Sequence, residues 1–167
     1  MTISSEAVRE LRELTGIGIL DCKQALEETD GDLEKAKENL RRKGLAVAAK
    51  KADRETAQGL VQHYVHHDGR LGALAELNCE TDFVARTDAF RQLAQQIALQ
   101  VAGANPTYVS PEEIPEGCDG DPKELCLLLQ PFIRDESRSV QDLIAEAIRK
   151  TGENIRVRRF ARFELGR

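Results

Sequence analysis

Residues 71–101 join two hydrophobic periodicities at one sharp junction. From Leu71 to Cys79, apolar side chains recur at every second residue, which is the period of a β-strand with one buried face. From Phe90 to Val101 they recur at helical spacing, and Thr87 or Asp88 can cap this helix. A strand followed directly by an amphipathic helix favours folds in which helices pack on a sheet.

The junction itself is the run from Asn78 to Arg86, N-C-E-T-D-F-V-A-R. It places Phe83 between an acid and a β-branched residue, in a chain with 4% aromatic residues and no Trp. Loops held by rigid elements are frequent sites of recognition, so Phe83 is either an exposed contact or a core residue at the start of the helix. Phe83 and Val84 cannot share a direction, so we expect one of them in the core and the other exposed.

The remaining pattern after residue 58 predicts an antiparallel α+β core of sheet packed with helices. Leu60 to His67 is rich in strand formers, and Asp68-Gly69 predicts a tight hairpin turn into the next strand. The apolar run Leu125–Phe132 is interpreted as a buried strand. Ser139 is the predicted cap of a further helix that stops at Gly152.

The last predicted strand, Ile155 to Leu165, is expected to have one apolar and one mainly basic face. The expected apolar side chains are Ile155, Val157, Ala161, Phe163 and Leu165. The opposite face is expected to carry Arg156, Arg158, Phe160 and Arg162. Such an arginine stripe could bind phosphates, but the alternation and the acidic total favour a salt-bridged sheet face.

Residues 1–44 show three short helical patterns that form a module of their own. They are separated at Thr15–Gly18 and at Thr29–Asp32, and Gly44 is expected to end the third helix. Three helices of this length make a marginal core and resemble a ubiquitin-associated-type module, a fold that commonly serves as a docking surface. The predicted division is a ubiquitin-associated-like three-helix module at 1–44, an Ala- and Lys-rich linker at 45–58, and an α+β core of the dimerisation type at 59–167.

Charge and hydropathy argue against two classes of partner. The net charge is −5 and the pI is about 5.3, whereas nucleic-acid binding depends on clustered Lys and Arg, so we expect no direct nucleic-acid partner. No apolar stretch approaches the roughly 20 residues of a membrane span, and the first residues lack the basic start and apolar core of a signal peptide. We therefore expect no membrane partner and a cytoplasmic location.

The reactive side chains form neither a catalytic pattern nor a metal-binding one. The four cysteines are Cys22, Cys79, Cys118 and Cys126. Their spacing fits no zinc template, so free thiols are expected, with Cys118 the most exposed. His63 and His67 would share a strand face about 13 Å apart, which is too far for one zinc ion. Without a glycine-rich phosphate loop or a Ser/His/Asp arrangement, we expect no enzymatic activity, no cofactor and no metal site.

Three stretches carry a resemblance to a known family. L-R-E-L-T-G-I-G and D-C-K-Q-A-L lie within Leu11–Leu26, N-C-E-T-D-F-V-A-R is Asn78–Arg86, and G-E-N-I followed by R-R-F lies within Gly152–Phe160. They occur in the expected order and span nearly the whole chain. The chain therefore resembles bacterial translation elongation factor Ts, in its short form.

The resemblance implies guanine nucleotide exchange in translation elongation. Family members bind elongation factor Tu in its GDP form and promote GDP release by disturbing the magnesium and phosphate site, until GTP binds. The stretch that displaces the partner's magnesium corresponds to Thr81, Asp82, Phe83 and Val84. The family's N-terminal module docks on the nucleotide-binding domain of the partner, and the matching residues are Arg12, Ile19, Leu20 and Lys23.

The same residues also have plain structural interpretations. Considered alone, Ile19 and Leu20 are more often core residues of a small module, and Phe83 is more often buried than exposed. Arg12 and Lys23, considered alone, are more often solvated charges.

The resemblance also bears on assembly. Glu116 to Leu125 occupies the place of a longer helical segment in the family, so this chain is expected to be shortened there. Short members have one core and act as dimers, so a homodimer within a two-plus-two complex is expected. Two alternatives to the exchange factor remain: an RNA-associated module using the basic final strand, and an adaptor using the N-terminal helices.

Overall fold

The computed structural model describes residues 3–166 and divides into two compact units, with the boundary between Ala46 and Val47. Each unit has a hydrophobic core of its own and is described by itself.

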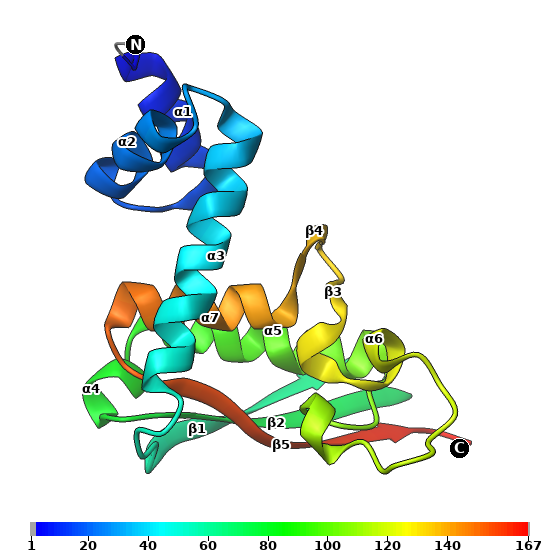
Figure 1. The fold of residues 1–167 in the computed structure, drawn as a ribbon. Helices are drawn as coiled ribbons and strands as arrows, with labels where there is room; N and C mark the ends of the chain where they lie inside the picture. Colours follow the sequence, from blue (N-terminus) through cyan, green and yellow to red (C-terminus); the bar gives the residue numbers. More distant parts are fainter. Residues whose placement is uncertain (1–2, 167) are drawn as a thin grey trace. The chain divides into compact units, whose positions relative to one another are not determined.

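The N-terminal unit is a three-helix core formed by α1 (Ser5–Thr15), α2 (Ile19–Glu28) and the first turns of α3 (Leu33–Lys51) (Figure 1). The hydroxyl of Ser4 accepts a backbone N–H of the first turn at 3.1 Å and caps α1. Gly16 ends α1 in the left-handed conformation, at a φ of 65° that favours glycine. The buried apolar residues of this core are Val8, Leu11, Ile17, Cys22, Ala25, Leu26, Ala36 and Leu40.

The prediction that Gly44 ends the third helix is wrong. α3 continues to Lys51, so residues 45–51 of the predicted linker 45–58 are helical. A glycine inside a helix costs about 0.5–1 kcal/mol relative to alanine, and the alanine-rich sequence that follows favours helix strongly enough to offset it. Ala48 packs against the core of the C-terminal unit, so this stretch is part of that unit rather than a bare connector.

The C-terminal unit is built on a three-stranded antiparallel sheet in the order β1-β2-β5. Its strands are β1 (Gln58–Val65), β2 (Leu71–Cys79) and β5 (Ile155–Glu164). Helices α5 (Asp88–Ala104) and α7 (Val140–Thr151) lie over one face of the sheet in Figure 1 and share one apolar cluster with it. An antiparallel sheet covered by helices, following a three-helix unit, confirms the predicted α+β class.

The buried faces predicted for β2 and α5 are confirmed. In β2 the buried side chains include Ala73, Ala75, Leu77 and Cys79. In α5 they include Phe90, Leu93, Ala94, Ile97, Ala98 and Val101. The cap predicted at Ser139 is also present, and it forms part of a capping box: the Ser139 hydroxyl accepts the Asp142 N–H at 3.2 Å, and the Asp142 carboxylate accepts the Ser139 N–H at 2.9 Å.

The predicted faces of β5 are correct at its start and wrong beyond Arg158. Leu77 pairs with Val157 whereas Glu76 pairs with Arg159, so Arg158 is an extra residue in a β-bulge. Because strand side chains alternate, one extra residue reverses the two faces beyond it. The side chains that consequently face solvent are Ala161, Phe163 and Leu165. Phe160 instead packs on the helix-covered core, and Arg162 donates to a carbonyl of α5.

Residues 105–139 form a connection of short elements. These are η1 (Pro111–Glu113), α6 (Pro122–Leu125), η2 (Leu127–Leu129), β3 (Pro131–Phe132) and β4 (Asp135–Ser139). The predicted buried strand at Leu125–Phe132 is therefore wrong. The buried Gln130 explains why, because its side-chain amide donates to the carbonyls of Ala104 and Glu124 at 3.2 and 2.7 Å and fixes a turn at this point.

Candidate functional site

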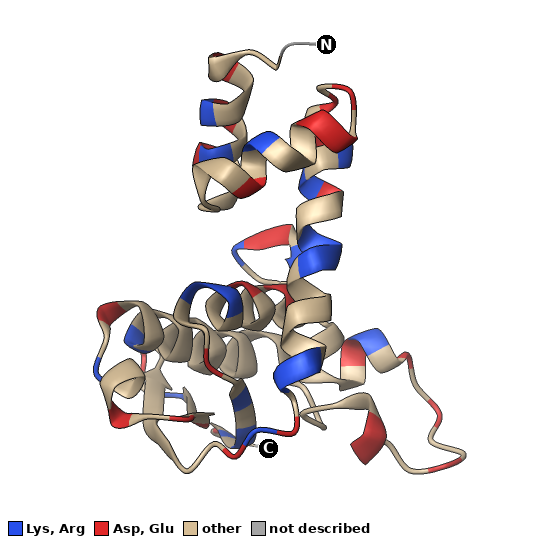
Figure 2. Cartoon of the chain, turned by 60° about the vertical axis from the view of Figure 1, so that its left-hand side comes forward, with Lys and Arg blue, Asp and Glu red and all other residues tan. Residues whose placement is uncertain are grey.

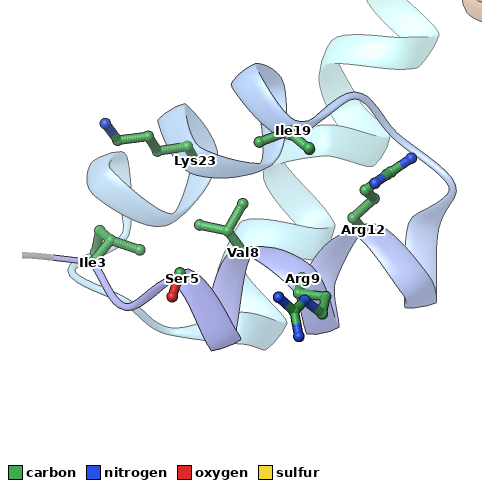
Figure 3. Close-up of a pocket in the computed structure, with 7 residues that line it drawn as sticks. All are labelled: Ile3, Ser5, Val8, Arg9, Arg12, Ile19 and Lys23. Carbon is green, nitrogen blue, oxygen red and sulfur yellow. The ribbon is translucent and has the colours of Figure 1, made fainter.

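The first candidate surface is a groove of about 510 Å³ between α1 and α2, which we call the N-terminal groove (Figure 3). Its lining residues are Ile3, Ser5, Val8, Arg9, Arg12, Ile19 and Lys23. In Figure 3, Val8 and Ile19 lie in the middle, and Arg12 and Lys23 lie toward opposite ends. An apolar floor with cations around it is complementary to an apolar segment that carries acidic residues.

Three of the four predicted docking residues, Arg12, Ile19 and Lys23, line this groove. Leu20 follows Ile19 on α2 and is 81% exposed, while Ile19 is 54% exposed. The interpretation of these two residues as module core is therefore wrong. Their exposure leaves apolar surface that a partner can bury.

Arg9 and Val8 also line the groove, and the sequence reasoning missed them. Arg9 precedes Arg12 by three residues, and residues at that spacing lie on one face of a helix, so this signal was available. Val8 has two roles. It is buried in the core of the N-terminal unit, and its edge also forms the groove floor.

The second candidate surface is the corner at residues 81–86, where the helical turn α4 (Asp82–Ala85) links β2 to α5. The hydroxyl of Thr81 accepts the Val84 N–H at 3.4 Å and caps this turn. The hydroxyl of Thr87 accepts an N–H of α5 at 3.2 Å and caps the next helix. Two caps in seven residues fix the path of the backbone from sheet to helix.

Phe83 projects from this corner into solvent and Val84 faces inward. Phe83 is 80% exposed, whereas Val84 is half-buried and packs against the core of the C-terminal unit. The alternative that Phe83 is a core residue is therefore wrong. An exposed Phe on a capped turn carries apolar surface in a defined position, which is a typical property of an interface anchor.

Asp82 also lies on the corner, beside Phe83. Its carboxylate forms an ion pair with the guanidinium of Arg86 at 2.9 Å, one helical turn away. Both side chains are well exposed, so this pair contributes no more than about 1 kcal/mol. A partner group can therefore replace Arg86 at small cost.

The third candidate surface is the face of the sheet opposite α5 and α7, which we call the outer sheet face. Val65, Gly72 and Phe163 are aligned across its three strands, and His63, Leu74 and Ala161 form the next row. Phe163 is 68% exposed and Val65 is 61% exposed. These side chains and Leu165 line an open hollow. A row of exposed apolar side chains across a sheet marks an interaction surface.

Comparisons with known proteins agree with the family resemblance of the sequence. The sequence profile described as "Elongation factor TS" matches residues 2–118, more than half of the chain. The protein "Elongation factor Ts" of Carboxydothermus hydrogenoformans is 49% identical over 194 residues, covering 98% of this chain and 89% of that protein. The chain belongs to the elongation factor Ts family. The protein "Elongation factor Ts" of Thermotoga neapolitana is 48% identical, covering 99% of this chain and 98% of that protein.

This member of the elongation factor Ts family has fewer residues than its alignments with the two relatives span. The alignments extend over 194 residues and the chain has 167, so the relatives carry residues that have no counterpart here. The family profile stops matching at Cys118, inside the Glu116–Leu125 segment that is expected to be shortened. In the structure this segment is an exposed loop followed by α6.

Within residues 3–166, the side chains of this family member form no group of three or more His, Cys, Asp or Glu that could hold a metal ion. Three of its cysteines are buried and Cys118 is exposed, as expected. Burial raises the pKa of the Cys79 thiol from 9.0 to about 11, and Cys79 donates to the Thr81 carbonyl at 3.1 Å. Cys79 therefore stays protonated near neutral pH and lacks the thiolate that a nucleophile needs.

The arginines of β5 are largely paired. Arg158 and Arg159 form ion pairs with Glu76 at 3.3 and 2.7 Å, and Arg162 forms one with Glu164 at 2.8 Å. Lys and Arg are interspersed with Asp and Glu along the ribbon (Figure 2). Since phosphate binding requires clustered free cations, this family member offers little support for the RNA-associated alternative.

None of the helices described is long and apolar enough to cross a membrane.

Proposed function

We propose that the chain is a guanine nucleotide exchange factor for elongation factor Tu. It would bind the GDP form of that partner and promote GDP release by disturbing the magnesium and phosphate site, until GTP binds. The observation that carries this proposal is Phe83, 80% exposed on the capped corner of a chain that belongs to the elongation factor Ts family. The chemistry is binding alone, without an enzymatic reaction and in the cytoplasm.

The energetic requirement is modest. A GTPase holds GDP mainly through phosphate contacts and magnesium coordination. Exchange requires that binding of the factor and binding of the nucleotide oppose each other, and this coupling is reciprocal. A tenfold loss of GDP affinity corresponds to about 1.4 kcal/mol. Burial of one Phe ring supplies about 1.5–3 kcal/mol, so Phe83 can drive a rearrangement of this size.

The four corner residues divide this work. Phe83 inserts into the partner, and Thr81 and Val84 hold its turn, one by a cap and one by packing. Asp82 leaves Arg86 and competes for a partner group that supports the magnesium site. The ion pair of Asp82 is exposed, so its exchange for a partner contact costs little.

The N-terminal groove would provide a separate docking contact. Ile19 and Leu20 supply apolar area, and Arg12 and Lys23 supply charge at the two ends of the groove. Charges around an apolar contact contribute mainly to the rate and specificity of association. Docking through the groove would keep the corner bound to the partner for a longer time, and it would not itself weaken the binding of GDP.

The chain is expected to accelerate release of a fluorescent GDP analogue from elongation factor Tu at substoichiometric amounts. Purified partner loaded with the analogue is mixed with excess unlabelled GDP, and the loss of fluorescence is followed with and without the chain. A rate that does not depend on the concentration of the chain would overturn the proposal. Unlabelled GDP in place of GTP shows that release itself is measured.

Replacement of both Ile19 and Leu20 by alanine should raise the concentration of chain needed for half-maximal release by about 10- to 100-fold. The reason is that alanine removes about half of the apolar burial that the two large side chains would contribute to the contact. The maximal rate at saturation should stay near the original. Leu14→Ala is the matched control, because Leu14 is 59% exposed and lies on the opposite side of α1 from Arg12. A lowered maximal rate with unchanged half-saturation would contradict the docking role.

We also propose that the chain acts as a homodimer within a two-plus-two complex. The support is the outer sheet face, where exposed apolar side chains of three strands form one surface without a covering helix in the part of the chain described. A two-fold axis through this surface would bring equivalent apolar rows together.

A further inference from the structure

The corner that carries Phe83 is held by the turn between α7 and β5, more than 70 residues later in the sequence. Glu153 lies in this turn, after Gly152, which ends α7 at a φ of 74°. The Thr81 N–H donates to Glu153 Oε2 at 3.0 Å. The Thr81 hydroxyl donates to Glu153 Oε1 at 2.6 Å. One carboxylate therefore accepts both donors of the residue that caps the Phe83 turn.

The same two segments are joined a second time, in the reverse direction. The Asn154 N–H donates to Glu80 Oε1 at 2.6 Å, so each segment provides a carboxylate for the other. Asn154 is buried, and its side-chain amide donates to the carbonyls of Ala52 and Arg54 at 3.2 and 2.8 Å. This backbone N–H, with the nearby Arg54, lowers the pKa of Glu80. The turn at 152–154 is thus also held by hydrogen bonds to a segment that is not part of the corner.

The two carboxylates differ in what they hold. The Glu80 carboxylate holds the 152–154 turn by accepting a backbone N–H of that turn, whereas the Glu153 carboxylate holds Thr81, the cap of α4. Thr81 has one hydroxyl, which donates to Glu153 and accepts from the Val84 N–H. Donation to a carboxylate orients this hydroxyl so that its lone pair faces the helical turn. Glu153 is thus linked through this hydroxyl to the turn that carries Phe83.

We propose that Glu153 is a positioning residue for nucleotide exchange: its carboxylate holds Thr81 and so aims the exposed Phe83 at the partner. This inference rests on the proposed function and adds to it a residue that contacts neither the partner nor the nucleotide. A displacement of about 1 Å in a working group can cost about 100-fold in rate. Loss of Glu153 should therefore reduce the effect of the corner while Phe83 itself is still present.

The first test compares Glu153→Ala and Glu153→Gln with the original chain in the GDP-release assay. Glu153→Ala should lower the maximal release rate by about 10- to 100-fold, with half-saturation changed by less than about threefold because the docking groove is in the other unit. Glu153→Gln keeps the size of the side chain and one acceptor, and should fall between the two. Glu116→Ala is the matched control, since it removes an exposed carboxylate from a loop.

The second test does not depend on exchange activity. Amide hydrogen exchange should become faster at Thr81, Val84 and Ala85 in Glu153→Gln, while amides in the middle of β2 keep their protection. Thr81→Val, which removes the hydroxyl, should lower the rate and add little to the effect of Glu153→Gln. Original release rates in Glu153→Ala, or unchanged protection at the corner, would overturn the inference. If the unaltered chain fails to release GDP while corner protection still depends on Glu153, the proposed function fails and the positioning contact stands.

Discussion

Phe83→Ala should reduce the acceleration of GDP release by about 10- to 100-fold, since about 1.5–3 kcal/mol of apolar burial is lost at the contact. The reduction should appear in the maximal rate, because Phe83 belongs to the corner in the C-terminal unit, whereas the N-terminal groove belongs to the other unit. The measurement is release of a fluorescent GDP analogue from elongation factor Tu, followed over a range of chain concentrations up to saturation.

The stability of the folded chain should change little in this variant. Phe83 is 80% exposed, and exposed substitutions usually change the free energy of unfolding by less than about 0.5 kcal/mol. Ile133→Ala is a suitable control, because Ile133 is a large apolar residue of the same unit that is 46% exposed and outside the corner. An unaltered rate in Phe83→Ala, with an active original chain, would exclude insertion of Phe83 as the cause of exchange.

Phe163→Glu should dissociate the proposed homodimer. In a two-fold interface the substitution acts on both subunits, so the dissociation constant should rise by about 100- to 10,000-fold, from two losses of about 1.5–3 kcal/mol. Sedimentation equilibrium of the free chain over a wide concentration range measures this directly. The variant should be monomeric where the original chain is dimeric.

Leu14→Glu is the control for added charge on an exposed apolar residue, because it lies on α1 in the N-terminal unit. It should leave the oligomeric state unchanged. An original chain that sediments as a monomer, and that binds elongation factor Tu one to one, would contradict the dimer. A dimer that survives Phe163→Glu would place the interface elsewhere than on the outer sheet face.

Much of this fold was predictable because local signals and tertiary packing agree. The period of two in Leu71–Cys79 and the helical period in Phe90–Val101 both lie on faces that the structure buries. The serine caps at Ser4 and Ser139 are local hydrogen bonds, so sequence suffices to find them. The docking residues Arg12, Ile19 and Lys23 came from the family resemblance, and the structure adds that they line one groove.

The errors arose where an interaction that hydrophobic periodicity does not show decides the path of the backbone. Gly44 predicts a helix end, but α3 continues through it into residues that pack on the core of the C-terminal unit. The apolar run Leu125–Phe132 reads as a strand, but bonds from Gln130 to two carbonyls impose a turn. Alanine-rich helix propensity decides the first place and the side-chain hydrogen bonds of Gln130 decide the second, and hydrophobic periodicity reveals neither.

Residue patterns were sufficient to predict the class of fold, the family, and a corner between strand and helix at residues 81–86. The outward direction of Phe83 and the inward direction of Val84 became clear only from the folded chain, because that choice depends on which side of the short turn meets the core. The bulge at Arg158, which turns Phe163 to solvent, depends on pairing with β2. The hold of Glu153 on Thr81 depends on a turn that folding brings to the corner from the far end of the chain.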